Sequence, residues 1–180
     1  MDEAGFQSTL QGAASGDRRA LTALYARYNR VLVRYLRVHA PGYGEDLAHE
    51  TWLSVTPALR QFTGSERAFR MMLLAEARRQ AVEFKRASGQ GRVKPVAPSC
   101  FTGLRATSVG DEPVADAALA ELLAGLRPLH AEILLLRVVG GLSAEETGAL
   151  LGKSPGMIRV TQHRVLKQLA RRLGNDRVAQ

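Results

Sequence analysis

The sequence is poor in the residues that cross-link a chain or anchor it in a membrane. A single cysteine, Cys100, stands among 180 residues, so the chain cannot form an internal disulfide. The four histidines are scattered without a second ligand at a metal-binding spacing, and we predict neither a metal site nor a cofactor. No apolar run approaches the roughly 18 residues that cross a bilayer. We therefore expect no membrane insertion.

Signals for export and for catalysis are equally scarce. Residues 1–17 lack the basic and apolar stretches of a signal peptide, and together with the lone cysteine this predicts a reduced, cytoplasmic protein. The sequence has no phosphate-binding glycine loop, nucleophile elbow or paired-carboxylate site, so we do not expect an enzyme. A lone thiol without an activating partner is usually incidental, and we assign Cys100 no role.

Acidic residues are outnumbered by basic ones. The chain has 25 Lys and Arg against 17 Asp and Glu, which gives a net charge of +8 and an isoelectric point near 10.4. An excess of this size favours a polyanionic partner, either nucleic acid or an anionic membrane surface. Apolar residues make up 46% of the chain, which is enough for a folded core.

Apolar residues recur with the period of amphipathic helices through the first half of the chain. We predict helices over residues 18–38, from residue 45 to about 59, and over residues 66–86, with loops at 40–44 and 62–64. Pro57 should kink or shorten the end of the second helix, because proline removes a helical hydrogen bond. Trp52 and Phe69 fall on inward faces, and we expect both in the core.

Residues 88–116 interrupt the helical pattern. This stretch is rich in Gly, Pro and Ser, and it is longer than ordinary connections within a domain. We interpret it as a linker between two small helical domains, residues 1–87 and 117–180. Helical periodicity returns at Asp116, and a short helix further along should bury Ile133, Leu134, Leu136 and Val138.

The end of the second domain has the features of a helix-turn-helix. Ser143, with Glu146 three residues later, forms a capping-box pattern at the start of the first helix. Gly148 lets the two helices pack closely, and Gly152 supplies a turn conformation that is costly for other residues. The second helix is predicted from residue 154 to about residue 173.

One face of this second helix is basic, since every charged residue between positions 153 and 173 is Lys or Arg. Ile158, Val165, Leu169 and Leu173 form its inward stripe. Such a helix fits the DNA major groove, where Arg can hold guanine bidentately. A solvated basic helix is the alternative, but the preceding helix, the glycine turn and the one-sided charge favour DNA binding. The predicted contacts are Lys153, Ser154, Arg159, Val160, His163, Arg164, Lys167 and Arg171.

Residues 44–53, GEDLAHETWL, resemble a segment of bacterial sigma factors of the extracytoplasmic-function (ECF) type. The family uses this segment, with its acidic-Asp-Leu-x-Gln-Glu-x-aromatic-Leu pattern, to dock on RNA polymerase. ALYARY at 23–28 resembles the family's opening helix, and residues 127–137 also match. The resemblance covers about residues 17–87 and 117–173. Met72 and Gln162 depart from it, where Trp and Leu are frequent.

The resemblance implies a division of work between the two domains. Residues 1–87 would bind the β′ clamp of core RNA polymerase and the −10 promoter element, and residues 117–180 would bind the β flap and the −35 element. The basic helix would contact the −35 element. The residues expected on the polymerase are Asp46, Leu47, Glu50 and Leu53. Those expected at the −10 element are Phe62, Ser65, Arg67, Arg70, Arg78, Arg79, Lys85 and Arg86.

The sequence thus predicts an all-α protein with a sigma region 2-like bundle of three or four helices, a flexible linker and a four-helix, sigma region 4-like domain. Its expected function is that of a sigma factor, which directs promoter-specific transcription. By resemblance, the linker runs through or near the polymerase channel leading to RNA exit, and an anti-sigma factor is a candidate partner. Two other interpretations stay open, a freestanding helix-turn-helix repressor or activator and a helical adaptor that binds only protein.

Overall fold

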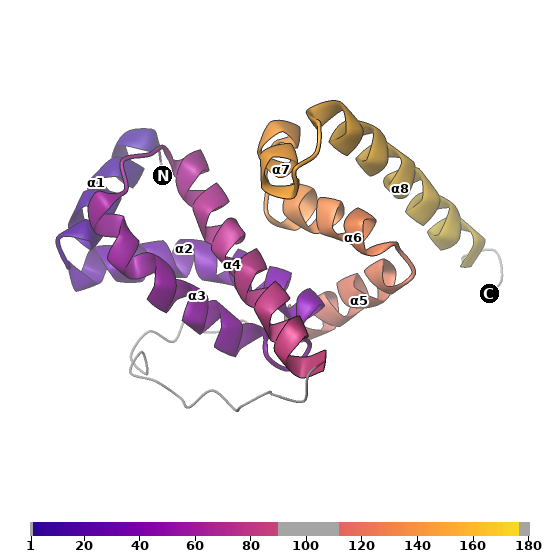
Figure 1. The fold of residues 1–180 in the computed structure, drawn as a ribbon, viewed down its shortest axis with the longest axis horizontal. Helices are drawn as coiled ribbons and strands as arrows, with labels where there is room; N and C mark the ends of the chain where they lie inside the picture. The colour runs from indigo at the N-terminus through magenta and orange to yellow at the C-terminus, as the bar shows by residue number, and fades with distance from the viewer. Residues whose placement is uncertain (1, 90–111, 177–180) are drawn as a thin grey trace. The chain divides into compact units, whose positions relative to one another are not determined.

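The computed structural model describes residues 2–89 and 112–176, and these ranges are helical apart from short turns (Figure 1). No strand occurs within them, which confirms the predicted all-α class. The chain divides into two compact units, with the boundary between Pro113 and Val114. Most of the expected linker, including Cys100, lies outside the described residues. None of the described helices combines the length and the apolar character of a bilayer span.

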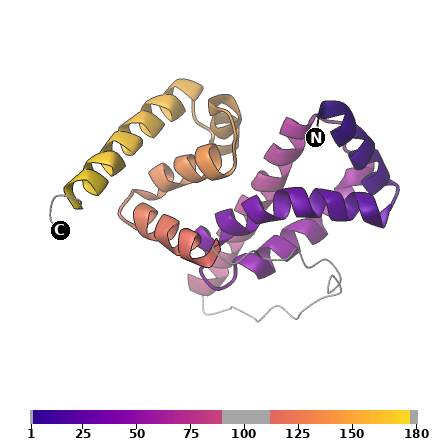
Figure 2. The same ribbon diagram turned by 180° about the vertical axis from the view of Figure 1, so that it is seen from behind.

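Unit 1 is a bundle in which α2 packs against α1, α3 and α4 (Figure 2). Pro57 lies inside α3, one residue before its end, and the chain continues directly into a 3₁₀ turn. The elements are α1 (Glu3–Ala14), α2 (Arg18–His39), α3 (Gly44–Ala58), the short 3₁₀ helix η1 (Leu59–Gln61) and α4 (Glu66–Gly89).

Phe69 on α4 lies at the centre of unit 1, and its side chain is fully buried. Tilted and edge-on aromatic pairs around it add favourable contacts to the burial of apolar area. One ring thereby joins all four α-helices of the unit to the loop before α4. The ring centroids closest to Phe69 are those of Tyr28 at 5.1 Å, Phe6 at 5.7 Å, Phe62 at 6.0 Å and Trp52 at 6.5 Å.

Helix α1 falls in a stretch for which the sequence predicts no element. Asp2 caps it, because its carboxylate accepts a hydrogen bond from the Gly5 amide at 2.9 Å. Its buried face holds only Phe6, Leu10 and Ala13. A stripe of two large apolar residues among small and polar ones is too sparse to show helical periodicity, so the sequence pattern does not predict this helix.

Unit 2 contains α5 (Glu112–Ala124), α6 (Pro128–Leu134), the π-helical turn η2 (Leu135–Val139), α7 (Ala144–Leu151) and α8 (Pro155–Asp176). Ile133, Ala144 and Ile158 form a buried cluster that joins α6, α7 and α8. Helix α5 begins four residues before Asp116, where helical periodicity was expected to return. Pro113 is tolerated there, because the first turn of a helix has no internal partner for its missing amide.

Val138 corrects one prediction about the core of unit 2. Its side chain is 63% exposed, although the sequence pattern assigned it to the inward face with Ile133, Leu134 and Leu136. The cause is the π turn, in which the Gly140 amide donates to the Leu135 carbonyl at 2.8 Å. The wider turn rotates the residues at its end away from the α-helical register.

Replacing Phe69 with Ala should destabilise unit 1 by about 3–5 kcal/mol, because the ring is fully buried and leaves a cavity among four other rings. Trp52 is the only tryptophan of the chain, so its fluorescence during urea unfolding measures this unit. Leu53→Ala on the same helix as Trp52 is the control, since Leu53 is 39% exposed. Equal unfolding midpoints for the two variants would contradict a central role for Phe69.

Candidate nucleic-acid and protein interfaces

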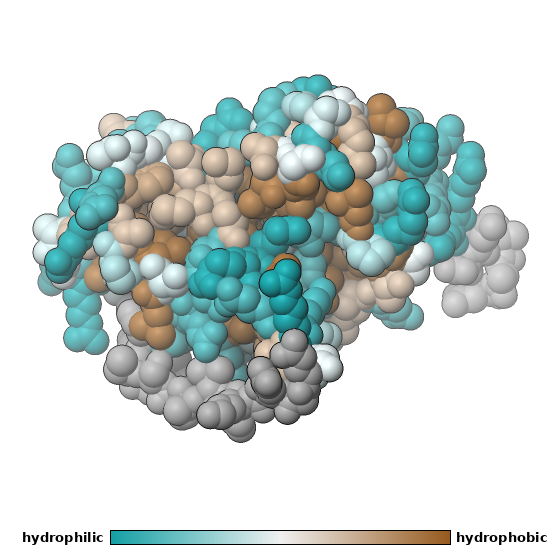
Figure 3. Space-filling view, in the orientation of Figure 1, coloured by the Kyte–Doolittle hydropathy of each residue, from teal (hydrophilic) through white to brown (hydrophobic). Residues whose placement is uncertain are grey.

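The basic face predicted on the last helix is present on α8. Ile158, Val165 and Leu169 are buried against the rest of unit 2, while the side chain of Leu173 is outside the described part of the chain. Hydrophilic side chains gather over the end of α8 nearest the C-terminus (Figure 3), whereas Val160 and Leu166 are exposed apolar residues of the same helix. All the residues predicted to contact DNA are exposed, namely Lys153, Ser154, Arg159, Val160, His163, Arg164, Lys167 and Arg171.

The turn between α7 and α8 has the geometry of a helix-turn-helix. Ser143 and Glu146 form the predicted capping box at the start of α7. Gly152 has φ of +64°, in the left-handed region that favours glycine. A Cβ atom on Gly148 would lie 2.6 Å from the Lys153 carbonyl oxygen, so only glycine lets the turn approach α7 this closely. Ser154 then caps α8 by accepting from the Met157 amide at 3.2 Å.

The cations on the α8 face differ in how far the protein neutralises them. Arg159 forms an ion pair with Glu145 on α7, which ties its guanidinium to the first helix of the motif. Arg164, Lys167 and Arg171 have no carboxylate partner among the described residues. The positive charge of these three side chains is therefore available to an anionic ligand.

In unit 1, α3 and α4 enclose a groove of about 200 Å³, which we call the acidic groove. It holds three carboxylates and no cation. Asp46 and Glu50 lie one helical turn apart on its wall, and neither has a basic partner in the described ranges. Its lining consists of Tyr43, Asp46, Leu47, Glu50, Gln80, Glu83, Phe84 and Ala87.

Two residues predicted to contact the polymerase, Leu47 and Leu53, differ from Asp46 and Glu50 in their surroundings. Leu47 is 4% exposed, so it belongs to the core beneath the groove and offers little surface to a partner. Leu53 is exposed but does not line the groove. Leu47 lies on the inward face of α3, together with the buried residues Ala48, Thr51 and Trp52.

Five residues that line the groove are not among the predicted contacts, and three of these, Tyr43, Glu83 and Phe84, give it aromatic and acidic character. Tyr43 and Phe84 form a ring pair at 4.8 Å between the start of α3 and the end of α4. Glu83 stands beside them and forms an ion pair with Arg79 at 2.6 Å. No sequence signal links positions 43 and 84, because only the packing of α3 on α4 brings them together.

The loop before α4 holds two of the residues predicted at the −10 element. Phe62 is half-buried and packs edge-on against Phe69 at 6.0 Å. Ser65 is exposed, and its hydroxyl accepts from the Ala68 amide at 3.3 Å as the cap of α4. Arg67 is exposed on the first turn of the helix.

The basic residues of α4 do not form one open face. Arg70 pairs with Glu66 at 2.9 Å, and Arg79 pairs with Glu76 at 2.5 Å as well as with Glu83. Hydrogen bonds from the Arg79 guanidinium lower the pKa of Glu76 to about 2. Lys85 lies 3.1 Å from a ring nitrogen of His39, Arg78 is half-buried and Arg86 is exposed. Arg79 is thus committed to two carboxylates of its own helix.

Helix α1 holds the loop before α4 in place. Gln7 donates to the Gly64 carbonyl at 2.9 Å and to the Glu3 carboxylate at 3.1 Å. The same Glu3 oxygen accepts from the Glu66 amide at 3.2 Å, at the first residue of α4. The loop is therefore fixed from two sides, by Phe69 below and by α1 alongside.

Comparison with known proteins places the chain among transcription proteins. The Sigma-70, region 4 family matches residues 116–169. The chain is 38% identical over 170 residues to the ECF RNA polymerase sigma factor ShbA of Streptomyces griseus, which covers 87% of this chain and 89% of ShbA. It is 35% identical over 168 residues to the ECF RNA polymerase sigma factor SigD of Mycobacterium tuberculosis, which covers 87% of this chain and 78% of SigD.

A solved structure has a similar fold. CnrH in complex with the cytosolic domain of CnrY matches with a TM-score of 0.66 at 24% identity, and the match covers 93% of this chain and 96% of CnrH.

Replacing Gln7 with Ala should loosen the loop before α4 while leaving the core of unit 1 intact. One hydrogen bond of this kind contributes about 0.5–1.5 kcal/mol, so amide hydrogen exchange at residues 64–66 should accelerate roughly two- to tenfold. The unfolding midpoint reported by Trp52 should change little. Gln11→Ala, at an exposed position of the same helix, is the matched control. Unchanged exchange at residues 64–66 would show that α1 does not restrain the loop.

Proposed function

The chain belongs to the ECF RNA polymerase sigma factors, which direct RNA polymerase to promoters, and we propose that its two units divide this task. Unit 1 binds the β′ clamp of core polymerase and the −10 element. Unit 2 binds the β flap and the −35 element. The observation that carries this proposal is the separation of charge between the acidic groove of unit 1 and the cationic outer face of α8.

The acidic groove is the proposed contact with the polymerase. Asp46 and Glu50 supply negative charge that no described residue neutralises, and the Tyr43–Phe84 pair supplies exposed aromatic surface next to it. Aromatic residues surrounded by charge of one sign are typical of protein interfaces, where charge sets the partner and rings supply contact area. Leu47 supports this surface from below, and Leu53 stays a proposed contact at its edge.

The loop before α4 is the proposed reader of the −10 element. Phe62 presents a half-buried ring and Ser65 an exposed hydroxyl, groups that can stack on an unpaired base and hydrogen-bond to its edge. Arg67 and Arg86 are proposed to hold phosphates of the separated strand, with Arg78 and Lys85 in support. Arg70 and Arg79 are better explained as structural residues, because carboxylates of α4 already bind them.

Helix α8 is the proposed reader of the −35 element. Its exposed side carries Val160, His163 and Arg164 in the first half, where the helix of a helix-turn-helix enters the major groove. Lys153 and Ser154 precede the helix and suit phosphate contacts. Lys167 and Arg171 continue the cationic face toward the C-terminal end, and Arg159 reaches the DNA from the flank that Glu145 fixes.

The proposal also covers catalysis, cellular location, regulation and the path of the linker. The chain itself catalyses no reaction, and phosphodiester chemistry stays with the core enzyme. Because its partners are polymerase and the chromosome, we place it in the cytoplasm. An anti-sigma factor stays a candidate regulator, and the linker is proposed to follow the RNA-exit channel. A freestanding helix-turn-helix regulator would give the acidic groove of unit 1 no role.

Replacing Asp46 with Asn and Glu50 with Gln together should weaken holoenzyme assembly roughly five- to tenfold, mainly through slower association. The difference should shrink at high salt, because screening weakens exposed charges. Titration of labelled protein with core polymerase at two ionic strengths measures both effects. Glu121→Gln, an exposed carboxylate of unit 2, is the control. If the double variant bound core polymerase as tightly as the control, the groove would not be the docking site.

Replacing Arg164 with Ala should cost about 1–3 kcal/mol at the cognate −35 element and relax its sequence preference. The measurement is run-off transcription by the reconstituted holoenzyme on a set of −35 variants. Arg18→Ala removes the same charge from the surface of unit 1 and should leave the preference intact. An identical rank order of −35 variants for the wild type and Arg164→Ala would rule out base contact by this residue. Lack of any promoter-specific transcript from the wild-type holoenzyme would contradict the whole proposal.

A further inference from the structure

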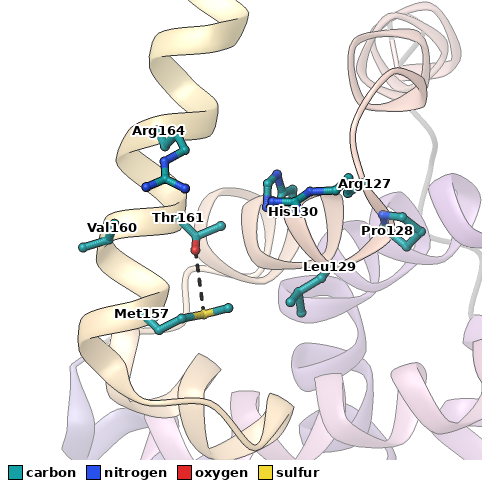
Figure 4. A pocket seen from close by; sticks show the side chains of 8 residues that line it. All are labelled: Arg127, Pro128, Leu129, His130, Met157, Val160, Thr161 and Arg164. Carbon is teal, nitrogen blue, oxygen red and sulfur yellow. Dashed lines mark hydrogen bonds between the residues drawn. The ribbon is translucent and has the colours of Figure 1, made fainter.

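A second cavity, which we call the basic pocket, lies within unit 2 between the start of α6 and the first half of α8 (Figure 4). Its volume is about 600 Å³. Two arginines and a histidine stand on its walls, and none of its lining residues is acidic. The lining consists of Arg127, Pro128, Leu129, His130, Met157, Val160, Thr161 and Arg164.

The two arginines and the histidine of the pocket come from two elements. Arg127 and His130 belong to the start of α6, and Arg164 stands on α8 (Figure 4). A nitrogen of the Arg127 guanidinium lies 2.6 Å from Nε2 of His130. Arg has only donors, so Nε2 of His130 is the acceptor of this contact. Burial and the positive charges of Arg127 and Arg164 lower the pKa of His130, which favours the neutral ring.

Within the described ranges, neither arginine of the pocket is neutralised by a carboxylate. The described residues provide no carboxylate partner for Arg127 or Arg164, whereas Arg159 on the same helix is paired with Glu145. Leu129, Met157 and the methyl side of Thr161 form an apolar floor, where the Thr161 hydroxyl contacts the Met157 sulfur at 3.7 Å. Both arginines are exposed, and each guanidinium can donate charge-assisted hydrogen bonds to an anion.

We propose that the basic pocket binds a backbone phosphate of promoter DNA beside the −35 element, with Arg127 as its main donor and His130 as the residue that positions Arg127. This inference rests on the proposed function of α8. Val160 and Arg164 line the pocket and also belong to the face assigned to the major groove. The DNA strand at the edge of that groove therefore passes the mouth of the pocket.

The side chain of Arg127 is suited to a binding role because it has no part in starting α6. Arg127 stands at the N-cap position, yet its side chain makes no capping hydrogen bond. Pro128 at the first position already fixes the backbone for a helix. Truncating Arg127 should therefore remove a phosphate contact without unfolding unit 2, and circular dichroism checks this.

The test compares holoenzymes that contain wild-type protein, Arg127→Ala, Arg127→Lys, Arg164→Ala or the control Arg18→Ala, binding to a promoter duplex over a range of salt concentrations. Arg127→Ala should weaken binding roughly tenfold, because it removes one charge-assisted contact. The slope of log K against log salt should become shallower by about 1. The loss should be uniform across −35 sequences, and Arg127→Lys should restore most of the slope.

Duplexes with a single neutral methylphosphonate locate the phosphate. At one position near the −35 element, the substitution should weaken the wild type but not Arg127→Ala. The inference is overturned if Arg127→Ala matches Arg18→Ala in affinity and slope, or if every methylphosphonate weakens both proteins equally. Relaxed −35 preference in Arg164→Ala with no effect of Arg127→Ala would overturn this inference alone. No effect of either variant would instead count against the proposed function of α8.

Discussion

The burial of Phe69 is the constraint on which unit 1 depends. Its ring contacts aromatic rings from α1, α2, α3 and the loop before α4, so the position of that loop follows from the packing of the core. Hydrogen bonds from Gln7 and Glu3 add a second restraint. A loop that must present Phe62 and Ser65 to DNA is thus held rigidly, which reduces the entropy lost on binding.

Charge that is left unneutralised distinguishes the surfaces of the two units. Several cations are paired internally, as Arg79 is with Glu76 and Glu83 and Arg159 is with Glu145. The acidic groove keeps Asp46 and Glu50 without a basic partner in the described ranges, and the basic pocket keeps Arg127 and Arg164 without an acidic one. A negatively charged surface and a positively charged surface favour different partners. Binding of the wrong partner is disfavoured, because bringing like charges together costs free energy.

The errors of the sequence analysis have local physical causes. Helix α1 was missed because Phe6 and Leu10 are the only large residues of its buried face. Val138 was placed inside because the prediction assumed an α-helix, whereas a π turn rotates it outward. Leu47 was expected on the polymerase-binding surface because the family resemblance covers residues 44–53 as a whole. It does not distinguish the buried face of this helix from the exposed one.

Local patterns in the amino-acid order are enough to predict the all-helical class, the helix-turn-helix with its capping box, and the inward stripe and cationic face of α8. These features follow from periodicity, capping and turn chemistry, which act between residues a few positions apart. The neutralisation of individual charges and the grouping of residues around a groove depend on how the helices pack. Asp46 and Glu83 line one groove, and Arg127 and Arg164 line one pocket, although each pair is far apart in the sequence. Electrostatic and packing energies depend on distance in space and not on separation along the chain.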